Sequence, residues 1–342
     1  MTTLVAQVAP QRSTQYAAVA TALAPHELIL SPLGQLISEL DSVKLGDQAY
    51  LRFNLPAPPD AGQCRELGWL ALTSGFFIYY DRIGQHLGPL LRPLETHVPT
   101  ALPQDLLMAR RYRGKTNELF TQFLCNVARY SSAYADRAWD TLRVFDPLAG
   151  GGTSLFAGLV LGADVAGVES EHGDVESTAT FLGEYLREQG VHYDLRQERL
   201  RKLGHRWSFT IRKATPESAL QRCLLAHGDT ARSQELIAGF SPHLIVTDLP
   251  YGIQHQGPLV ALLTAGLPAW ASLLAEGGVL AFSWDATRFP RSEMIALVGT
   301  IDKLQVLNEP PYDRLAHRVD RVIKQRDVLV ARLVRDQIGA NP

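Results

Sequence analysis

The sequence has few cysteines, no long apolar run and no excess of charge of either sign over its 342 residues. Its three cysteines, Cys64, Cys125 and Cys223, have no short spacing. That spacing excludes a zinc ribbon and a disulfide scaffold and is typical of a reducing compartment. No apolar run approaches the roughly 18–20 residues that span a bilayer, and residues 1–15 lack the charged start and apolar stretch of a signal peptide. The sequence therefore predicts a cytoplasmic protein that does not enter a membrane.

Several motifs of catalytic and metal sites are also missing. The histidines, cysteines and acids show no metal-ligand spacing, so no metal is expected. No G-x-S-x-G nucleophile elbow occurs. The run Gly114-Lys115-Thr116 is similar to the end of a P-loop, but Ala109 stands where the first glycine is required. Nothing in the sequence indicates an oligomeric state.

Proline spacing divides the chain. Prolines recur at positions 89, 93, 99 and 103, and a basic stretch begins at Arg110. This predicts a boundary near residue 105, with an α+β appendage at 1–105 and a larger domain at 106–342. In the appendage we expect strands at 28–30, 49–53 and 75–80, and helices at 33–40 and 67–72. Its six Lys/Arg against nine Asp/Glu do not make it an obvious clamp on a nucleic acid, although it could position a substrate.

The larger domain alternates apolar strand patterns with helical ones. Strands are expected at 142–145, 165–168, 243–247, 278–283, 305–307 and 327–333, and helices at 117–130, 153–161, 175–187 and 259–274. This alternation predicts a doubly wound, mostly parallel sheet with helices on both faces, and ligands bind beyond the carboxyl ends of such strands. An insertion is expected within 190–215.

A glycine-rich turn follows the first of these strands, in the run Asp146-Pro147-Leu148-Ala149-Gly150-Gly151-Gly152-Thr153. Glycines there let the backbone approach a ligand and turn into a helix. The turn alone suits a dinucleotide, a phosphate or S-adenosylmethionine. Asp146 favours the last, because its carboxylate repels a pyrophosphate but attracts the ammonium of a methionine moiety. Residues expected to bind this cofactor are Asp146, Ala149, Gly150, Gly152 and Thr153.

Two further acids are candidates for the same cofactor. Glu169 ends the next strand, where a carboxylate can accept both ribose hydroxyls. Asp229, in His227-Gly228-Asp229, could accept from an adenine amino group or could be a solvated turn residue.

The most specific motif is Asp248-Leu249-Pro250-Tyr251-Gly252, directly after the strand at 243–247. An exocyclic amine of a nucleobase is a poor nucleophile because its lone pair is delocalised into the ring. The Asp248 carboxylate and a carbonyl near Pro250 could accept its N–H groups and localise that lone pair. Pro250 stiffens the loop, and the Tyr251 ring offers a face on which an extruded base can stack. These three residues are the predicted catalytic residues.

The glycine turn and this loop together resemble the amino-methyltransferases of nucleic acids. The Asp-Leu-Pro-aromatic-Gly form is most similar to tRNA guanosine-N2 methyltransferases that carry a THUMP domain and to their uncharacterised bacterial relatives. The resemblance covers residues 108–335. It implies a seven-stranded, Rossmann-like class I methyltransferase domain with S-adenosyl-L-methionine as cofactor. It also implies that the segment 112–117, with Thr116, closes over the methionine end of that cofactor.

The resemblance implies a nucleic-acid substrate, RNA before DNA. Guanosine N2 of tRNA is the first expectation, and adenine N6 or cytosine N4 of DNA is the second. A non-catalytic nucleic-acid-binding protein with this fold and a nicotinamide oxidoreductase are the rivals. One basic cluster lies within 196–213 and a second within 314–326. Because the second lies between the sixth and last expected strands, it is the better candidate for substrate phosphates. The predicted substrate-binding residues are Arg314, Arg318, Arg321 and His255.

Overall fold

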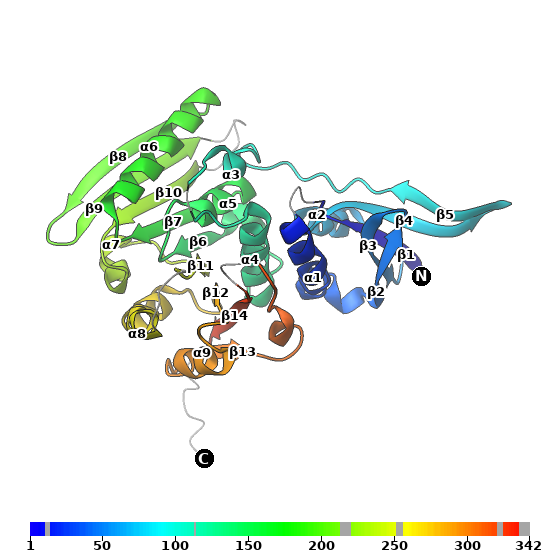
Figure 1. Ribbon diagram of the computed structural model, residues 1–342. Helices are drawn as coiled ribbons and strands as arrows, with labels where there is room; N and C mark the ends of the chain where they lie inside the picture. Colours follow the sequence, from blue (N-terminus) through cyan, green and yellow to red (C-terminus); the bar gives the residue numbers. More distant parts are fainter. Residues whose placement is uncertain (11–13, 113, 213–219, 251–255, 320–323, 335–342) are drawn as a thin grey trace, which may run out of the picture. The chain divides into compact units, whose positions relative to one another are not determined.

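The computed structural model describes residues 1–10, 14–112, 114–212, 220–250, 256–319 and 324–334. By their packing they form two compact units, one of residues 1–99 with 309–326 and one of residues 100–308 with 327–342 (Figure 1). The packing thus assigns the segment 309–326 to the N-terminal unit. The domain boundary that the sequence predicts near residue 105 stays a prediction.

The N-terminal unit is an antiparallel sheet with two helices. Its five strands have the order β2-β3-β1-β4-β5. They are β1 (Thr2–Val8), β2 (Ser38–Leu45), β3 (Gln48–Leu55), β4 (Thr73–Ile83) and β5 (His86–Pro93). The helices are α1 (Thr14–Leu30) and α2 (Ala61–Trp69), with the short turns η1 (Gly34–Leu36) and η4 (Tyr312–Arg314). The α+β class expected for this part of the chain is confirmed.

Two local expectations for this unit were wrong. Residues 28–30 end helix α1 instead of forming a strand, because Ala20, Ala24 and Leu28 are buried at the i, i+4 spacing of one helical face. Residues 33–40 form η1 and the start of β2 instead of a helix. Glu27 fixes the position of α1, since its buried carboxylate accepts the backbone N–H groups of Ala71 and Leu72, both at 2.9 Å.

The second unit contains a mixed sheet of nine strands with the order β13-β14-β12-β11-β6-β7-β10-β9-β8. The strands are β6 (Arg143–Asp146), β7 (Asp164–Glu169), β8 (Tyr193–Leu200), β9 (Gly204–Arg212), β10 (Leu220–His227), β11 (Leu244–Asp248), β12 (Val279–Asp285), β13 (Leu304–Leu307) and β14 (Arg326–Leu333). The five strands β12, β11, β6, β7 and β10 are parallel to their neighbours in this series. β13 and β14 are antiparallel to each other. The predicted doubly wound sheet is confirmed.

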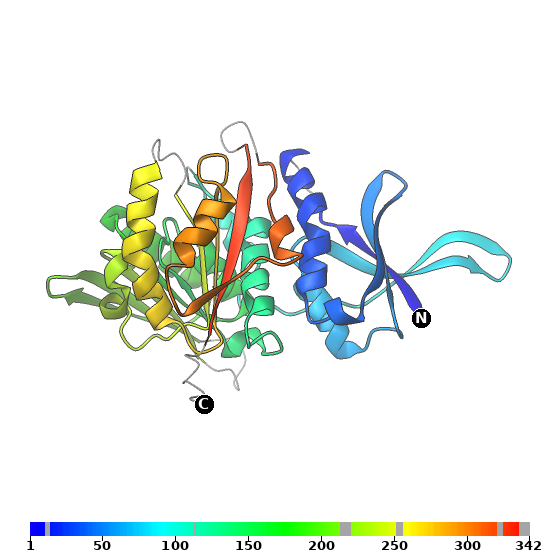
Figure 2. The same ribbon diagram turned by 90° about the horizontal axis from the view of Figure 1, so that it is seen from below.

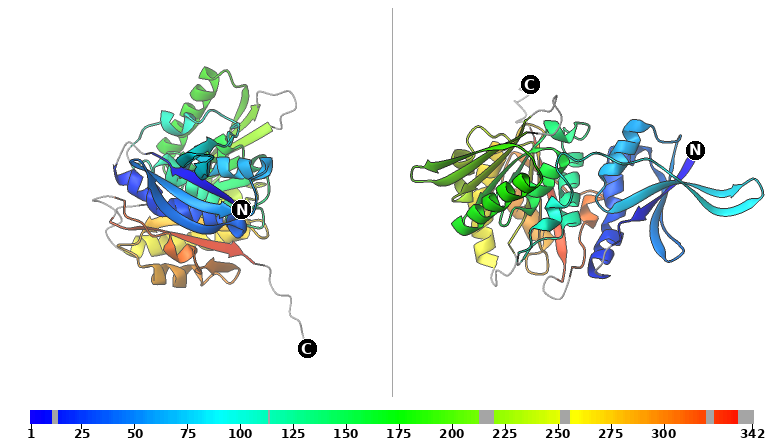
Figure 3. Two further views of the ribbon diagram at one scale, coloured as in Figure 1. Left: turned by 90° about the vertical axis from the view of Figure 1, so that its right-hand side faces the viewer. Right: turned by 90° about the horizontal axis from the view of Figure 1, so that it is seen from above.

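The seven strands expected of this fold are extended by one hairpin. Strands β8 and β9 form an antiparallel pair that continues the sheet beyond β10 (Figure 3). The hairpin accounts for the insertion expected within 190–215. It is attached by its β9 strand, so β8 is an edge of the sheet.

Helices cover both faces of this sheet (Figure 2). They are α3 (Leu106–Ala109), α4 (Glu118–Ser131), α5 (Thr153–Leu161), α6 (His172–Glu188), α7 (Ser233–Leu236), α8 (Gln256–Leu273) and α9 (Arg291–Val298), with the turns η2 (Trp139–Thr141) and η3 (Thr230–Arg232). The central strands are apolar at nearly every position and buried on both faces, as is typical of parallel sheets. On one face Phe145 and Ile245 pack with Leu267 and Trp270 of α8 and Met294 of α9.

No helix among the described residues is both long enough and apolar enough to cross a membrane.

Candidate active site

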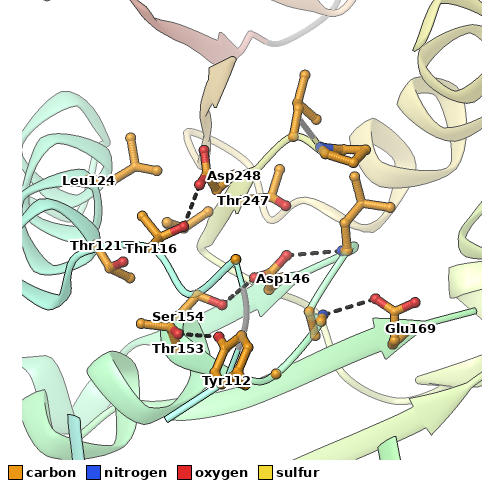
Figure 4. Close-up of a pocket in the computed structure, with 18 of the residues that line it drawn as sticks. Tyr112, Thr116, Thr121, Leu124, Asp146, Thr153, Ser154, Glu169, Thr247 and Asp248 are labelled. Atoms are coloured by element: carbon orange, nitrogen blue, oxygen red, sulfur yellow. Dashed lines mark hydrogen bonds between the residues drawn. The ribbon is translucent and has the colours of Figure 1, made fainter. Parts of the chain in front are cut away.

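A cavity of about 440 Å³ opens at the carboxyl ends of β6, β7 and β11 (Figure 4). This is the edge at which the strand alternation predicts ligand binding. It contains the glycine turn, the end of β7 and the start of the loop after β11. Its lining residues include Tyr112, Thr116, Thr121, Leu124, Asp146, Leu148, Ala149, Gly150, Gly151, Thr153, Ser154, Glu169, Thr247, Asp248, Leu249 and Pro250. The structure therefore brings most of the predicted cofactor residues into one site with Asp248.

The glycine turn requires glycine for two separate reasons. Gly150 and Gly152 have φ angles of 47° and 86°, in the left-handed region that other residues rarely adopt. A Cβ atom on Gly152 would also lie 2.8 Å from the Cγ2 atom of Thr178. The turn runs directly into α5, which begins at Thr153. Its backbone can therefore come close to a bound molecule at the amino end of that helix.

Glu169 is held against the glycine turn. Its Oε2 atom accepts the Gly150 N–H at 2.9 Å, and its Oε1 atom accepts the Glu171 N–H at 3.0 Å and the Ser170 hydroxyl at 2.9 Å. The carboxylate is thus fixed at the end of β7 while it lines the cavity. A fixed acceptor at this place suits the predicted recognition of vicinal hydroxyls, which stays a prediction.

Asp146 is a buried carboxyl group at the end of β6. It accepts the Leu148 N–H at 2.9 Å and the Ser154 hydroxyl. Burial raises its pKa from 3.8 to about 6, against the opposing effect of the hydrogen bonds from Ser154 and Leu148. A carboxyl group with this pKa responds strongly to a cation in the cavity, because the cation stabilises its charged form.

Asp248 ends β11, and two hydroxyl groups from other segments hold its carboxylate. Its Oδ2 atom accepts the Thr116 hydroxyl at 2.5 Å, and its Oδ1 atom accepts the hydroxyl of Ser283. Ser283 lies directly beside it in the parallel pairing of β11 and β12. The carboxylate is therefore oriented by three elements, which are β11, β12 and the segment before α4.

The segment before α4 forms a wall of the cavity. The Tyr112 hydroxyl is hydrogen-bonded to that of Thr153, and burial raises the pKa of Tyr112. Arg110 donates to the Gly151 carbonyl at 2.5 Å and to Ser177 at 2.6 Å. These bonds tie residues 110–112 to the glycine turn and to α6, and Thr116 continues the same wall to Asp248.

Sequence reasoning missed three hydroxyl residues of this site. Ser154 and Ser283 hold Asp146 and Asp248, and Thr247 lines the cavity between them. Ser283 is buried near the carboxyl end of β12, whose first four residues are apolar. That position was a usable signal, because a polar residue there lies at the same edge as the aspartate that ends the neighbouring strand.

Some predicted site residues lie elsewhere. Asp229 is exposed, begins η3 and accepts the Ala231 N–H at 2.9 Å, and it is outside the cavity lining. Arg314 and Arg318 are exposed and belong to the N-terminal unit by packing. The pKa of His26 in α1 is lowered by burial and by the nearby Arg314, which places this segment beside that helix of the unit. Tyr251, His255 and Arg321 lie outside the described residues.

The described residues contain no group of three or more His, Cys, Asp or Glu side chains placed to hold a metal ion.

No protein-family model and no curated protein matches the chain. Several solved structures are similar to it. TrmN from Thermus thermophilus is 14% identical, with a TM-score of 0.47, over 98% of this chain and 100% of that one. The rRNA methyltransferase aviRa from Streptomyces viridochromogenes is 16% identical, with a TM-score of 0.38, over 67% and 91%. The 16S rRNA N2 G1207 methyltransferase RsmC from T. thermophilus is 14% identical, with a TM-score of 0.36, over 88% and 59%. All three TM-scores lie below 0.5, so these similarities carry no argument about function.

Proposed function

We propose that the protein is an S-adenosyl-L-methionine-dependent methyltransferase that methylates an exocyclic amine of a nucleobase. One observation carries the proposal: the Asp248 carboxylate lies in the same cavity as the glycine turn and is held there by Thr116 and Ser283. A binding protein without activity has no need of a carboxylate aimed in this way.

The cavity suits the cofactor in size and chemistry. Its volume of about 440 Å³ lies in the range of roughly 300–1,000 Å³ that is usual for small-molecule sites. Asp146 would attract the ammonium of the methionine part, and Glu169 would accept the ribose hydroxyls. The glycine turn 149–153 would lie along the part of the cofactor that joins these two groups. When bound, the cofactor supplies a methyl group on a sulfonium, which needs no metal for its transfer.

The catalytic contribution of this chain is orientation and proton acceptance. Asp248, with its two hydroxyl partners, would accept an N–H of the target amine and direct the nitrogen lone pair towards the cavity. The same carboxylate would take the proton that the methylated amine releases. Pro250 restrains the backbone that follows, and Tyr251 is proposed as the stacking face for the base.

RNA is the proposed substrate class, with guanosine N2 in tRNA as the proposed target. The support is the Asp-Leu-Pro-Tyr-Gly sequence at 248–252 and its resemblance to that group of enzymes. We also propose that residues 1–105, whose sheet is separate from the one that forms the cavity, position the substrate. Asp229, His255, Arg314, Arg318 and Arg321 remain proposed contacts with cofactor or substrate.

The test is methyl transfer from tritiated S-adenosylmethionine to two separate acceptors, total tRNA and undermethylated genomic DNA. Label in tRNA that nucleoside mass spectrometry identifies as N2-methylguanosine supports the proposal in full. Label in DNA alone would replace RNA by DNA as the substrate. No label in either acceptor, with S-adenosylhomocysteine still bound, would contradict methylation of nucleic acid.

A further inference from the structure

We propose that the turn of the β8–β9 hairpin is a second nucleic-acid contact, which binds backbone phosphates of the strand whose base enters the cavity. This inference rests on the proposed function and extends it to a surface outside the cavity. The contact consists of Arg199 at the end of β8, Arg201 and Lys202 in the turn, and His172, whose ring packs on His205, the partner of Arg199 across the hairpin.

The strand register places this turn at the same edge of the sheet as the cavity. β10 is parallel to β7, with His227 opposite Glu169. β9 is antiparallel to β10, with His205 opposite His227. The turn between β8 and β9 therefore lies at the carboxyl edge. Neighbouring strands are about 4.8 Å apart, so β9 and β8 are roughly 10 and 14 Å from β7, where Glu169 lines the cavity. A nucleic-acid strand that leaves the cavity along this edge can reach the turn.

The charges of the hairpin are balanced along its body and unbalanced at its turn. Arg196 and Arg206 pair with Glu198 at 2.7 and 2.5 Å, and Arg212 lies 3.8 Å from Asp194. Arg199, Arg201 and Lys202 are exposed, and none of these three has an ion-pair partner among the residues that the structure describes. Three free cations in four positions form a local positive patch on a chain whose formal net charge is −2.

A cluster of rings joins the start of α6 to β9 and to the end of β10. His172 lies 5.3 Å from His205, 5.0 Å from His227 and 5.8 Å from Trp207, measured between ring centroids. Its side chain is 44% exposed, whereas Trp207 is buried. Proteins bind single-stranded nucleic acids through exposed rings and nearby cations, because bases stack on the rings while the cations bind phosphates.

Edge protection is the alternative explanation of these cations. Strand β8 is a sheet edge, and charged side chains on an edge prevent pairing with another chain. That role requires charged residues along the whole strand and does not require them to gather at one of its ends. It also predicts no change in nucleic-acid affinity when only the turn is neutralised.

The experiment compares two triple variants that remove the same charge. R199Q/R201Q/K202Q neutralises the turn. R187Q/R212Q/K303Q neutralises three exposed cations at the opposite, amino edge of the same sheet, where α6 and β9 end and β13 begins. Each variant is titrated with a fluorescein-labelled 20-nucleotide single-stranded RNA of mixed sequence, and with DNA of the same sequence, over a range of salt concentrations. Binding of S-adenosylhomocysteine serves as the measure of an intact cavity.

We expect the turn variant alone to lose affinity. Three phosphate contacts on a single strand make the slope of log K against log salt steeper by about 2. Losing them should lower the affinity for RNA by up to about 100-fold at 0.1 M salt. S-adenosylhomocysteine affinity should not change, and the amino-edge variant should bind RNA within about twofold of wild type. A preference of this contact for RNA or for DNA will be read from the two probes.

Equal RNA affinities and salt slopes for the two variants, with a wild type that binds and methylates RNA, would overturn this inference and leave the proposed function intact. A wild type that binds neither probe would overturn this inference alone, because methyl transfer to tRNA decides the proposed function separately. Loss of S-adenosylhomocysteine binding in the turn variant would also overturn the inference, since the turn would then act through the cavity.

Discussion

The titration of Asp146 gives the sharpest test of the cofactor site. Its pKa is raised to about 6 because the carboxyl group is buried and its desolvation outweighs the hydrogen bonds it accepts. If the ammonium of the cofactor binds beside it, the ionised form is the one that binds. The protein without cofactor must then lose a proton from Asp146 whenever the cofactor binds below about pH 6.

The expected size of the effect follows from that pKa. The ionised fraction of a group with a pKa of about 6 is roughly 0.09 at pH 5 and 0.97 at pH 7.5. Affinity for S-adenosylhomocysteine, which has the same ammonium, should therefore rise about tenfold from pH 5 to pH 7.5 and then level off. The sign is fixed: a raised pKa disfavours the charged form in the free protein, so a ligand that needs the charge binds more weakly as the pH falls.

Isothermal titration calorimetry measures both parts of this prediction. Affinity is determined between pH 5 and 7.5, and buffers with different ionisation enthalpies report the released proton, about 0.5 per site at pH 6. The control is D146N, in which this pH dependence should disappear while other titrating groups are retained. A wild-type affinity that is flat over this range, or a pH dependence that persists in D146N, would refute the role given to Asp146.

Three further substitutions test other parts of the structure. D248N should abolish methyl transfer to RNA and leave S-adenosylhomocysteine affinity within about threefold, because Asp248 is assigned to the amine; loss of cofactor binding would contradict that assignment. G152A should lower the free energy of unfolding by about 1–3 kcal/mol, since φ is 86° and its Cβ would meet Thr178; denaturant unfolding measures this, and an unchanged midpoint would contradict it. E27A should leave two buried N–H groups of the N-terminal unit without an acceptor and lower its free energy of unfolding by about 2–4 kcal/mol. Protease sensitivity of that unit should rise while cofactor affinity stays constant.

The sheet domain was predictable because its signals are local and repeated. Buried parallel strands are continuous apolar runs, and the expected helix at 153–161 coincides with α5. The glycine turn and Asp248 follow two of these strands, so the alternation alone brings them to one edge. The N-terminal unit was harder, because the short apolar run at 28–30 fits a strand or a helix, and only the burial of Ala24 and Leu28 at i, i+4 spacing decides between them.

The sequence predicts the site residues that lie at the end of a strand and line the cavity themselves. It does not predict the residues that only hold such a residue in place. Asp248 is visible in the sequence, but the hydroxyls that hold it come from Thr116 and Ser283, which are distant in the chain. Their roles depend on the register of β11 with β12 and on the path of the segment before α4. One sequence gives neither this register nor this path, unless one first infers which residues lie together at the carboxyl edge of the sheet.

The basic cluster at 196–213 shows why counting charges is a poor guide to a binding surface. Seen as a sequence, its arginines are equivalent, and a solvated insertion explains them as well as a phosphate contact does. The hairpin separates them, because Glu198 and Asp194 neutralise the cations of the strands and leave those of the turn free. The turn is also the part of the hairpin that the β9–β10–β7 register brings to the edge of the cavity. Position in the sheet and the absence of an ion-pair partner therefore select the same three residues independently. These residues are a stronger candidate for a phosphate contact than the cluster as a whole.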